Sequence, residues 1–188
     1  MSFLVVGLGN IGPEYAHTRH NIGFDVVDAW AKAAGAAFST VRYGAITELK
    51  YKAKRFMLLK PSTYMNLSGK AVNYWMQAER FTIENLLIIV DDLALPFGTL
   101  RIRKQGSDGG HNGLKNINEL LGHSNYARLR IGIGNDFNRG QQIDFVLNEW
   151  TDEEQKALPP IISKAIDAVK SFGTTGIERT MTIFNTNS

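Results

Sequence analysis

Cysteine is absent from this chain of 188 residues, and its absence excludes several kinds of chemistry. Without a thiol the protein has no disulfide, no thiolate metal ligand and no cysteine nucleophile. A chain without disulfides fits a reducing compartment, and we predict that the protein is cytoplasmic. The sequence also lacks the G-x-S-x-G pattern of serine hydrolases, so a nucleophilic serine on that kind of turn is excluded as well.

Long hydrophobic runs are missing too. No apolar stretch approaches the ~18 residues that suggest a membrane span, so we predict no membrane partner. The start, Met1-Ser2-Phe3-Leu4-Val5-Val6, has no basic segment of the kind that opens a signal peptide. The composition, 44% hydrophobic and 21% charged, is that of a globular protein. With no repeats and no linker, the length predicts a single domain over residues 1–188.

Positive charge is concentrated in one segment. The formal net charge is +3, but residues 101–139 alone carry +4, which leaves −1 for the rest of the chain. The basic residues of this segment are Arg101, Arg103, Lys104, Lys115, Arg128, Arg130 and Arg139. Either a solvated basic face or a footprint for a polyanion such as nucleic acid accounts for such a concentration.

Apolar periodicity predicts alternating strands and helices, which is the pattern of an α/β fold. The predicted strands cover residues 3–6, 38–51 (as one or two strands), 55–60, 86–90, 99–104 and 127–133. The predicted helices cover residues 22–34, 67–78, 112–121 and 151–172. Residues 86–90 are continuously apolar, as in a central parallel strand. Within 151–172, Pro159-Pro160 predicts an irregular turn or a break.

A glycine motif follows the first predicted strand. Gly7-Leu8-Gly9-Asn10-Ile11-Gly12 matches the G-x-G-x-x-G pattern of dinucleotide-binding proteins, so a nicotinamide-dependent oxidoreductase is one alternative. That pattern needs a helix opening inside the motif and an acidic residue ~20 positions later. Here Pro13 follows at once, and Ala29-Trp30-Ala31 stands where the acid should be. We favour glycines that let the backbone approach a substrate, with Asn10 presenting a donor and an acceptor.

Polar residues recur just after apolar runs or at the starts of predicted helices. They are Asn10, His20, Asn66, Asp91 and Asn112. In an open α/β sheet such positions meet in the crevice outside the carboxyl ends of the strands. A histidine takes a proton from water when a carboxylate such as Asp91 orients it. The set therefore predicts hydrolysis of a carbonyl compound by water, although a surface or helix-capping role for His20 is the alternative.

Two of the asparagines have structural alternatives of their own. Asn66 stands where it would cap a helix, but its amide would equally bond a substrate backbone beside the soft apolar wall of Met65. Asn112 would either cap the helix that follows or hold the attacking water or the oxyanion. His17 and Glu14, near His20, would offer metal-ligand atoms, but no helix supports the spacing. We predict that His17 faces solvent and that the protein uses no metal.

Taken together, these segments resemble the bacterial peptidyl-tRNA hydrolase family. The matching blocks are Gly7-Leu8-Gly9-Asn10, Tyr15, Thr18-Arg19-His20-Asn21-Ile22-Gly23, Lys60-Pro61-Ser62-Thr63-Tyr64-Met65-Asn66-Leu67-Ser68-Gly69, Asp91-Asp92-Leu93, Gly109-Gly110-His111-Asn112-Gly113-Leu114-Lys115 and Leu129-Arg130-Ile131-Gly132-Ile133-Gly134. They occur in the family's order over nearly the whole chain. The resemblance implies a single α/β domain with a mixed, largely parallel twisted sheet and helices on both faces.

The resemblance also implies an activity and residue roles. The expected enzyme is a monomeric, metal-independent and cofactor-free esterase that cuts the bond between a peptide and the terminal ribose of tRNA. His20 would be the general base and Asp91 its orienting partner, with Asn10 and Asn112 completing the catalytic set. Substrate contacts would come from Tyr15, Met65, Asn66 and His111, and tRNA phosphates would be held by Arg103 and Arg130. A non-catalytic RNA-binding relative of the same fold is the rival interpretation.

Overall fold

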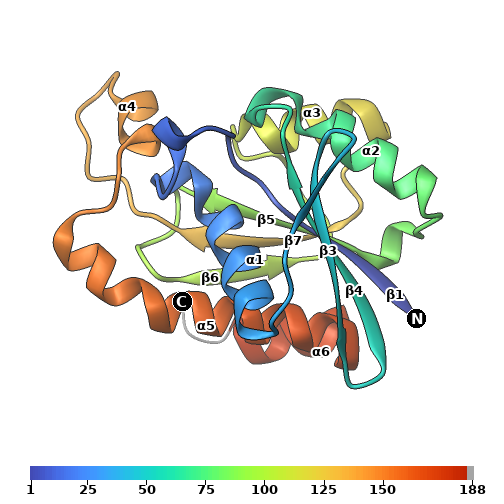
Figure 1. Cartoon of the computed structure of the whole chain (residues 1–188). Helices are drawn as coiled ribbons and strands as arrows, with labels where there is room; N and C mark the ends of the chain where they lie inside the picture. Colours follow the sequence, from blue (N-terminus) through green and yellow to red (C-terminus); the bar gives the residue numbers. More distant parts are fainter. Residues whose placement is uncertain (186–188) are drawn as a thin grey trace.

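The protein, seen as a computed structural model that describes residues 1–185, is built on one mixed sheet of seven strands (Figure 1). The strands are β1 (Ser2–Gly7), β2 (Ser39–Val41), β3 (Gly44–Tyr51), β4 (Lys54–Pro61), β5 (Leu86–Asp92), β6 (Leu100–Arg103) and β7 (Ala127–Gly132). The helices are α1 (Ile22–Ala33), α2 (Ser68–Ala78), α3 (Asn112–Leu121), α4 (Gln142–Leu147), α5 (Asp152–Thr175) and α6 (Ile177–Phe184). The last three residues of the predicted 1–188 domain lie outside the described residues.

The centre of the sheet is parallel and its edges are antiparallel. The strand order is β2-β3-β4-β1-β5-β7-β6, in which β1 pairs in parallel with β4 and β5, and β5 with β7. The strands β3 and β6 run antiparallel to β4 and β7. The carboxyl ends of the parallel strands β4, β1, β5 and β7 therefore lie at the same end of the sheet. The predicted site residue Asp91 lies at this end of β5, and Asn10 and Asn66 lie in the segments that follow β1 and β4. The predicted fold class, a mixed and largely parallel α/β sheet, is confirmed.

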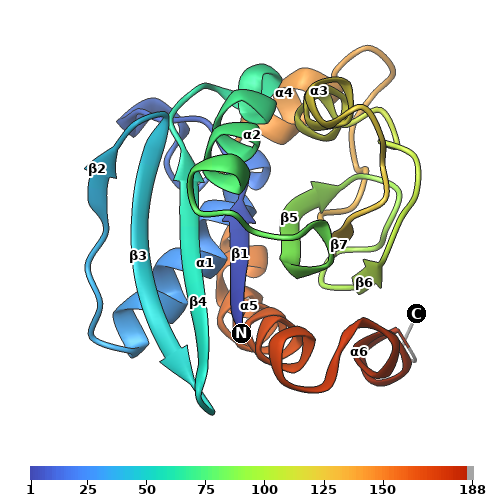
Figure 2. The same ribbon diagram turned by 90° about the vertical axis from the view of Figure 1, so that its right-hand side faces the viewer.

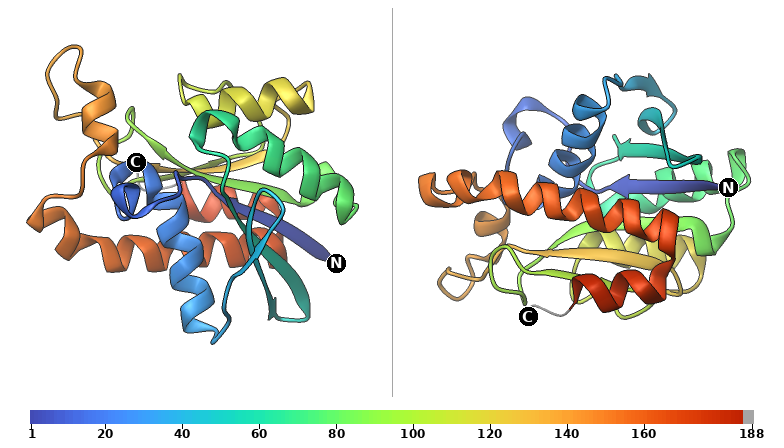
Figure 3. Two further views of the ribbon diagram at one scale, coloured as in Figure 1. Left: turned by 45° about the horizontal axis from the view of Figure 1, so that its top comes forward. Right: turned by 90° about the horizontal axis from the view of Figure 1, so that it is seen from below.

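Helices cover both faces of the sheet (Figures 2 and 3). Alternate side chains of β1 explain the two layers, because Phe3 and Val5 pack in the core beneath α1 and α5, whereas Leu4 and Val6 pack beneath α2 and α3. All of the β5 run Leu86–Val90 is buried. Continuous apolar character is what a strand covered on both faces requires.

The start of α1 is pressed against the end of β1 by a pair of glycines. A β-carbon on Gly7 would lie 2.1 Å from the carbonyl oxygen of Gly23, and one on Gly23 would lie 2.5 Å from the amide nitrogen of Leu8. Only glycine permits so close an approach of two backbones. The short 3₁₀ helix Arg19–Asn21 directly precedes α1, so this contact sets the position of His20.

Several predicted elements differ from the structure. The helix α5 runs unbroken through Pro159 and Pro160, so the predicted break is wrong. Both prolines are exposed, and the carbonyls that lose their donors belong to Gln155 and Lys156, whose residues are exposed to water. The helices α4 and α6 were not predicted. Residues 38–51 form two strands, which is one of the two forms expected there.

Within residues 1–185, no helix combines the length and the apolar character needed to cross a bilayer.

Candidate active site

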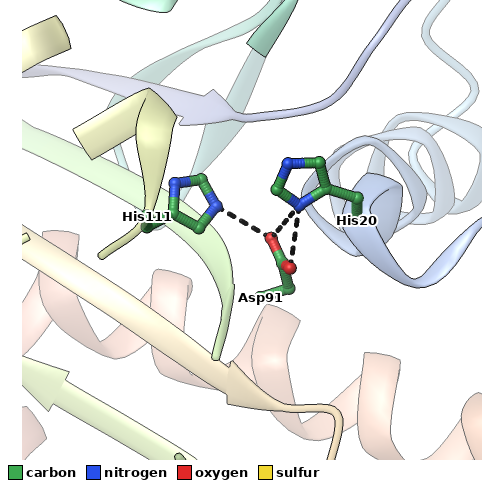
Figure 4. Close-up of side chains that lie close together, drawn as sticks. All are labelled: His20, Asp91 and His111. Carbon is green, nitrogen blue, oxygen red and sulfur yellow. Dashed lines mark hydrogen bonds and ion pairs between the residues drawn. The ribbon is translucent and has the colours of Figure 1, made fainter. Parts of the chain in front are cut away.

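The carboxylate of Asp91 accepts hydrogen bonds from two imidazoles (Figure 4). His20, which precedes α1, places its Nδ1 atom 2.9 Å from both carboxylate oxygens, and His111, which precedes α3, places its Nε2 atom 2.9 Å from Oδ1. The centroids of the two rings are 5.1 Å apart. Asp91 itself belongs to β5 and is only 4% exposed. Three segments far apart in the sequence therefore converge on one buried charge.

The hydrogen bonds of His111 determine its tautomer. Its Nδ1 atom accepts from the backbone N–H groups of Gly113 and Leu114, at 3.1 and 3.4 Å, so it caps the N-terminus of α3. An acceptor nitrogen carries no proton, so the proton sits on Nε2 and points at Asp91. For His20 the same logic puts a proton on Nδ1, because Asp91 can only accept, and leaves Nε2 as the basic atom.

The pKa values of the pair follow from this geometry. Burial acts to lower the pKa of His20, but the charge of Asp91 and its hydrogen bond outweigh burial, so the net pKa lies above its ordinary value. Burial acts to raise the pKa of Asp91, whereas the charges and hydrogen bonds of His20 and His111 bring it well below its ordinary value. Asp91 is therefore a fixed negative charge at neutral pH.

The same three residues bear on the question of a metal. One ligand atom from each of His20, Asp91 and His111 lies within 4.8 Å of the others. A metal binds a nitrogen through its lone pair, but the His111 nitrogen that faces Asp91 bears a proton, because the other nitrogen accepts from the backbone. The arrangement fits a hydrogen-bonded triad better than a metal centre. The absence of a metal stays a prediction.

A cavity of about 360 Å³ opens beside the triad. Its lining includes His20, Asp91, His111, Asn112 and Arg130. Larger hollows lie elsewhere, including one of about 470 Å³ between residues 136 and 148. Two of the other hollows are lined by His17 and Asp25, which also form a pair, but the His17 side chain is 80% exposed. In the 360 Å³ cavity the paired imidazole, His20, is 13% exposed and its carboxylate partner is 3% exposed, which makes this cavity the candidate active site.

Asn10 is held in place by hydrogen bonds of both its backbone and its side chain. The backbone N–H of Asn10 donates to the side-chain oxygen of Asn21 at 2.8 Å, and the side-chain amide of Asn21 donates to the backbone carbonyl of Asn10 at 2.8 Å. The Oδ1 atom of Asn10 accepts from the N–H of Met65 at 2.7 Å. With the oxygen engaged, the Nδ2 group of Asn10 is the part left to donate. Asn10 lines a second cavity, of about 380 Å³, on the α1 face.

Met65 joins Asn10 to the start of α3. A β-carbon on Gly113 would lie 2.8 Å from the Met65 sulfur and 3.0 Å from the His111 ring, so the three are packed together. Asn66, the next residue, is exposed and lies in the short helix Met65–Leu67. It does not cap α2, whose N-cap is Leu67, so the capping alternative for Asn66 is wrong.

Asn112 is exposed and is the first residue of α3, which His111 caps in its place, so the capping alternative is wrong for Asn112 too. Tyr15 ends the short helix Pro13–Tyr15, and its carbonyl accepts from the hydroxyl of Thr18 at 2.9 Å. No described contact joins its ring to the triad. The structure thus groups His20, Asp91, His111 and Asn112 in one cavity, whereas Asn10 lines another cavity and is linked to this group through Met65.

The basic residues occupy very different environments. Arg130 lines the cavity, donates to the carbonyl of Ser107 at 2.6 Å and lies 3.7 Å from Asp92. Arg103 is exposed and belongs to β6, where it lies opposite Arg128 in the antiparallel register of β6 and β7. This position is near the start of β7, at the end of the strand away from the cavity. Arg128 is fully buried, with its guanidinium bonded to backbone carbonyls of the 106–126 segment. Arg128 is therefore not part of a surface that could bind a polyanion, so one of the seven basic residues counted in segment 101–139 does not contribute to a basic face.

Sequence reasoning missed two supporting residues near His20. Asn21 lies in one of the matching blocks, but the sequence predicted no role for it; in the structure it forms hydrogen bonds with Asn10. Arg19 is buried and donates to Glu154 at 2.9 Å and to the carbonyl of Phe145 at 3.0 Å. No periodicity marks either residue, because their partners lie on other segments. His17 is 80% exposed, as predicted, and its Nδ1 atom lies 3.0 Å from Asp25.

Comparisons with known proteins agree on one family. The family model described as "Peptidyl-tRNA hydrolase" matches residues 4–188. A protein of that name from Bacteroides fragilis is 60% identical over 185 residues, which cover 98% of this chain and 99% of the relative. One from Cytophaga hutchinsonii is 55% identical, with 99% of each covered. The crystal structure of peptidyl-tRNA hydrolase from Acinetobacter baumannii is 34% identical, superposes with a TM-score of 0.91, and is matched over 98% of this chain and 94% of that one.

Proposed function

The chain belongs to the peptidyl-tRNA hydrolase family, and on this basis we propose that it hydrolyses the ester between a peptide and the 3'-terminal ribose of tRNA, with His20 as general base. The observation that carries the proposal is the pair in which Nδ1 of His20 lies 2.9 Å from Asp91 beside an open cavity. Because Asp91 occupies Nδ1, the basic nitrogen is Nε2. A base oriented in this way typically contributes 10²- to 10⁴-fold to the rate.

The reaction needs no protein nucleophile. Nε2 of His20 takes a proton from water as the oxygen attacks the ester carbonyl, and the carbonyl oxygen becomes an oxyanion. Collapse of this intermediate breaks the bond to the ribose oxygen, which receives the proton from His20. The products are a peptide carboxylic acid, which loses the second proton of the water to solvent, and a tRNA with a free hydroxyl. Asp91 stays ionised throughout and stabilises the imidazolium that forms.

The asparagines would supply the donors. The Nδ2 group of Asn10, which forms no hydrogen bond within residues 1–185, suits the carbonyl oxygen of the substrate, because the Oδ1 atom of Asn10 already accepts from Met65. Asn112 stands at the N-terminus of α3, where the helix dipole favours developing negative charge. Removing one such donor in other enzymes costs roughly 10²- to 10³-fold. We assign the exposed Asn66, with Met65, Tyr15 and His111, to substrate contact.

Phosphates of the tRNA are assigned to Arg130 and Arg103. The protein acts as a monomer in this proposal and requires neither metal nor cofactor. The dinucleotide alternative loses support, because the segment after Gly12 forms a short 3₁₀ helix and α1 begins only at Ile22. Titration with NAD tests that alternative directly, and saturable binding would revive it.

The experiment is hydrolysis of peptidyl-tRNA by the wild type, His20→Ala and His17→Ala. His17 is the control histidine, because its Nδ1 atom lies 3.0 Å from Asp25 and its 80% exposed side chain lies outside the 360 Å³ cavity, on the 380 Å³ cavity that Asn10 also lines. We expect His20→Ala to lose at least 10²-fold in kcat and His17→Ala to keep wild-type activity. Equal rates for His20→Ala and the wild type would end the assignment. A wild type that binds but does not cleave would favour the non-catalytic RNA-binding relative.

A further inference from the structure

The turn between β2 and β3 lies at the same end of the sheet as the site, where the parallel strands have their carboxyl ends. Because β3 runs antiparallel to β4, its first residue, Gly44, pairs with Pro61, the last residue of β4. In Figure 2, β2 runs toward and β3 away from the end of the sheet where β1 and β4 end. The N–H of Ser62 donates to the carbonyl of Tyr43 at 2.8 Å. The turn is thus tied to the segment that continues to Met65.

An arginine is held on this turn by aromatic rings. The guanidinium of Arg42 lies 5.1 Å from the ring centroid of Tyr43 and 5.3 Å from that of Tyr74 on α2. The two tyrosine rings are 5.6 Å apart, edge to face. The indole N–H of Trp75 donates to the carbonyl of Arg42 at 2.8 Å and fastens the turn to α2. Arg42 is nevertheless exposed. A guanidinium held in this way loses little side-chain entropy when it binds an anion.

A second cation completes the patch. Lys70 is exposed in the first turn of α2, where no acidic residue offsets the positive end of the helix dipole. Lys70 and Tyr74 are four residues apart on α2, so they lie on the same face of the helix. Arg42, through its hydrogen bond and charge, and more weakly the charge of Lys70, lower the pKa of Tyr43. Within residues 1–185 neither cation forms an ion pair. We call this set, Arg42, Tyr43, Lys70 and Tyr74, the hairpin patch.

We propose that the hairpin patch binds backbone phosphates of the tRNA substrate, as a second contact on the side of the site opposite Arg130. The strand order puts β3 and β4 on one side of β1 and β5, and β7 on the other. Paired cations with aromatic rings are a common arrangement of surfaces that bind nucleic-acid backbones. The charge of the peptide end varies with its sequence, whereas every nucleotide carries a negative phosphate, so charge complementarity favours the RNA.

The proposal rests on the proposed function, and its test uses the same reaction. We compare the wild type with the double variant Arg42→Gln, Lys70→Gln in steady-state hydrolysis of peptidyl-tRNA at several salt concentrations. Two lost phosphate contacts should raise KM about tenfold and flatten the slope of log(kcat/KM) against log salt by about 1.4 to 1.8. The value of kcat should change little, because the patch does not touch the reacting atoms. Arg42→Lys should keep most of the slope, since it keeps the charge.

Lys52→Gln is the matched control. Lys52 also lies over a tyrosine, 5.5 Å from the Tyr51 ring, and also sits on a hairpin turn, but at the other end of β3. It should leave KM and the salt slope unchanged. Thermal melting of each variant shows whether the fold is intact.

The outcomes separate the two proposals. No cleavage by the wild type would refute the proposed function. Normal cleavage with the same KM and salt slope in the double variant would overturn only the hairpin patch. If the double variant loses as much activity on a short acyl-adenosine ester, which lacks the tRNA body, the patch contacts the peptide end and the RNA assignment is wrong.

Discussion

Two histidines share the charge of Asp91, and their roles differ because their second nitrogens differ. The other nitrogen of His111 is occupied by backbone N–H groups of α3, whereas that of His20 forms no hydrogen bond within residues 1–185 and can act as a base. His111 therefore serves as a fixed donor that takes up part of the negative charge of Asp91. The charge left for His20 sets how strongly its protonated form is stabilised.

The pH dependence of kcat/KM tests this division of roles. Asp91 raises the pKa of His20 above 6.5, and only neutral His20 accepts a proton, so activity should fall as pH drops through a midpoint above that value. His111→Asn keeps a side-chain acceptor that can cap α3 but is too short to reach Asp91. Asp91 would then stabilise protonated His20 more strongly. We expect the midpoint to rise by roughly half a pH unit to one unit.

NMR titration of the His20 ring in the same variant supplies the independent measurement. His17→Ala is the control, because its ring is paired with a different carboxylate. An unchanged midpoint in His111→Asn would mean that His111 does not affect the charge available to His20.

Among the elements, the start of α5 is built together with the segment that carries His20. Thr151 and Glu154 form a capping box, in which the Thr151 hydroxyl accepts from the N–H of Glu154 and the Glu154 carboxylate accepts from the N–H of Thr151. The same carboxylate oxygen accepts from buried Arg19 at 2.9 Å. Arg19 immediately precedes His20, so the cap of one helix also fixes the entry to another.

Two substitutions separate the cap from the ion pair. Thr151→Ala removes the cap alone and should lower the free energy of unfolding by about 1 kcal/mol. Glu154→Gln keeps an oxygen for the cap but removes the negative charge that balances buried Arg19, which then keeps only its bond to the Phe145 carbonyl; this should cost about 2 kcal/mol or more. Urea denaturation measures both. A smaller loss in Glu154→Gln than in Thr151→Ala would show that the ion pair adds nothing.

The predicted elements were those with a strong apolar period. The run Leu86–Val90 predicted β5 because both its faces are covered. The short helix α4 has only Phe145 buried, and Ile143 is 71% exposed, so its sequence has no clear apolar face. Pro159 and Pro160 suggested a break because the sequence does not show that their side of α5 faces water.

The site shows the same limit. The positions of His20 and Asp91 after or beside apolar runs predicted that they would share one edge of the sheet, and they do. The reciprocal bonds between Asn10 and Asn21 and the contact of His111 with Asp91 depend on how loops fold back. The burial of Arg128 depends on carbonyls from other segments. Such contacts leave no periodic signal in a single sequence.

For the whole molecule, one partly buried carboxyl, that of Asp25, makes stability depend on pH. Burial raises the pKa of Asp25 to about 6, even though His17 acts to lower it. The pKa of Asp25 is therefore higher in the folded protein, about 6, than in the unfolded chain, near 3.8. This difference stabilises the folded protein fully at a pH below 3.8, and the stabilisation is lost as the pH rises through about 6. Asp25→Asn should therefore stabilise the protein about 1 kcal/mol more at pH 8 than at pH 5. Thermal melting at both pH values should show a gain in Tm that is roughly 2–4 °C larger at pH 8.

His17→Ala is the companion variant for Asp25. It removes the group that lowers the pKa of Asp25, so it should destabilise the protein at pH 8. An equal shift of Tm at both pH values in Asp25→Asn would rule out the raised pKa.

We expect the positive charge of the surface to govern how the protein binds tRNA. Arg103→Ala and Arg130→Ala should each flatten the slope of log(kcat/KM) against log salt by about one unit. Turnover of a small ester should be less affected, because it carries no phosphate chain. Measurement from low to physiological salt checks both variants against Lys52→Gln. Unchanged slopes would move the tRNA surface away from β6 and β7.

The most direct test of the account is cleavage of peptidyl-tRNA by the wild type and His20→Ala, each with and without a chelator. We predict rapid release of peptide by the wild type that the chelator does not change, and a loss of at least about 10²-fold in His20→Ala. Wild-type activity in His20→Ala, or activity that the chelator abolishes, would contradict the central claim that an imidazole oriented by Asp91 activates the water.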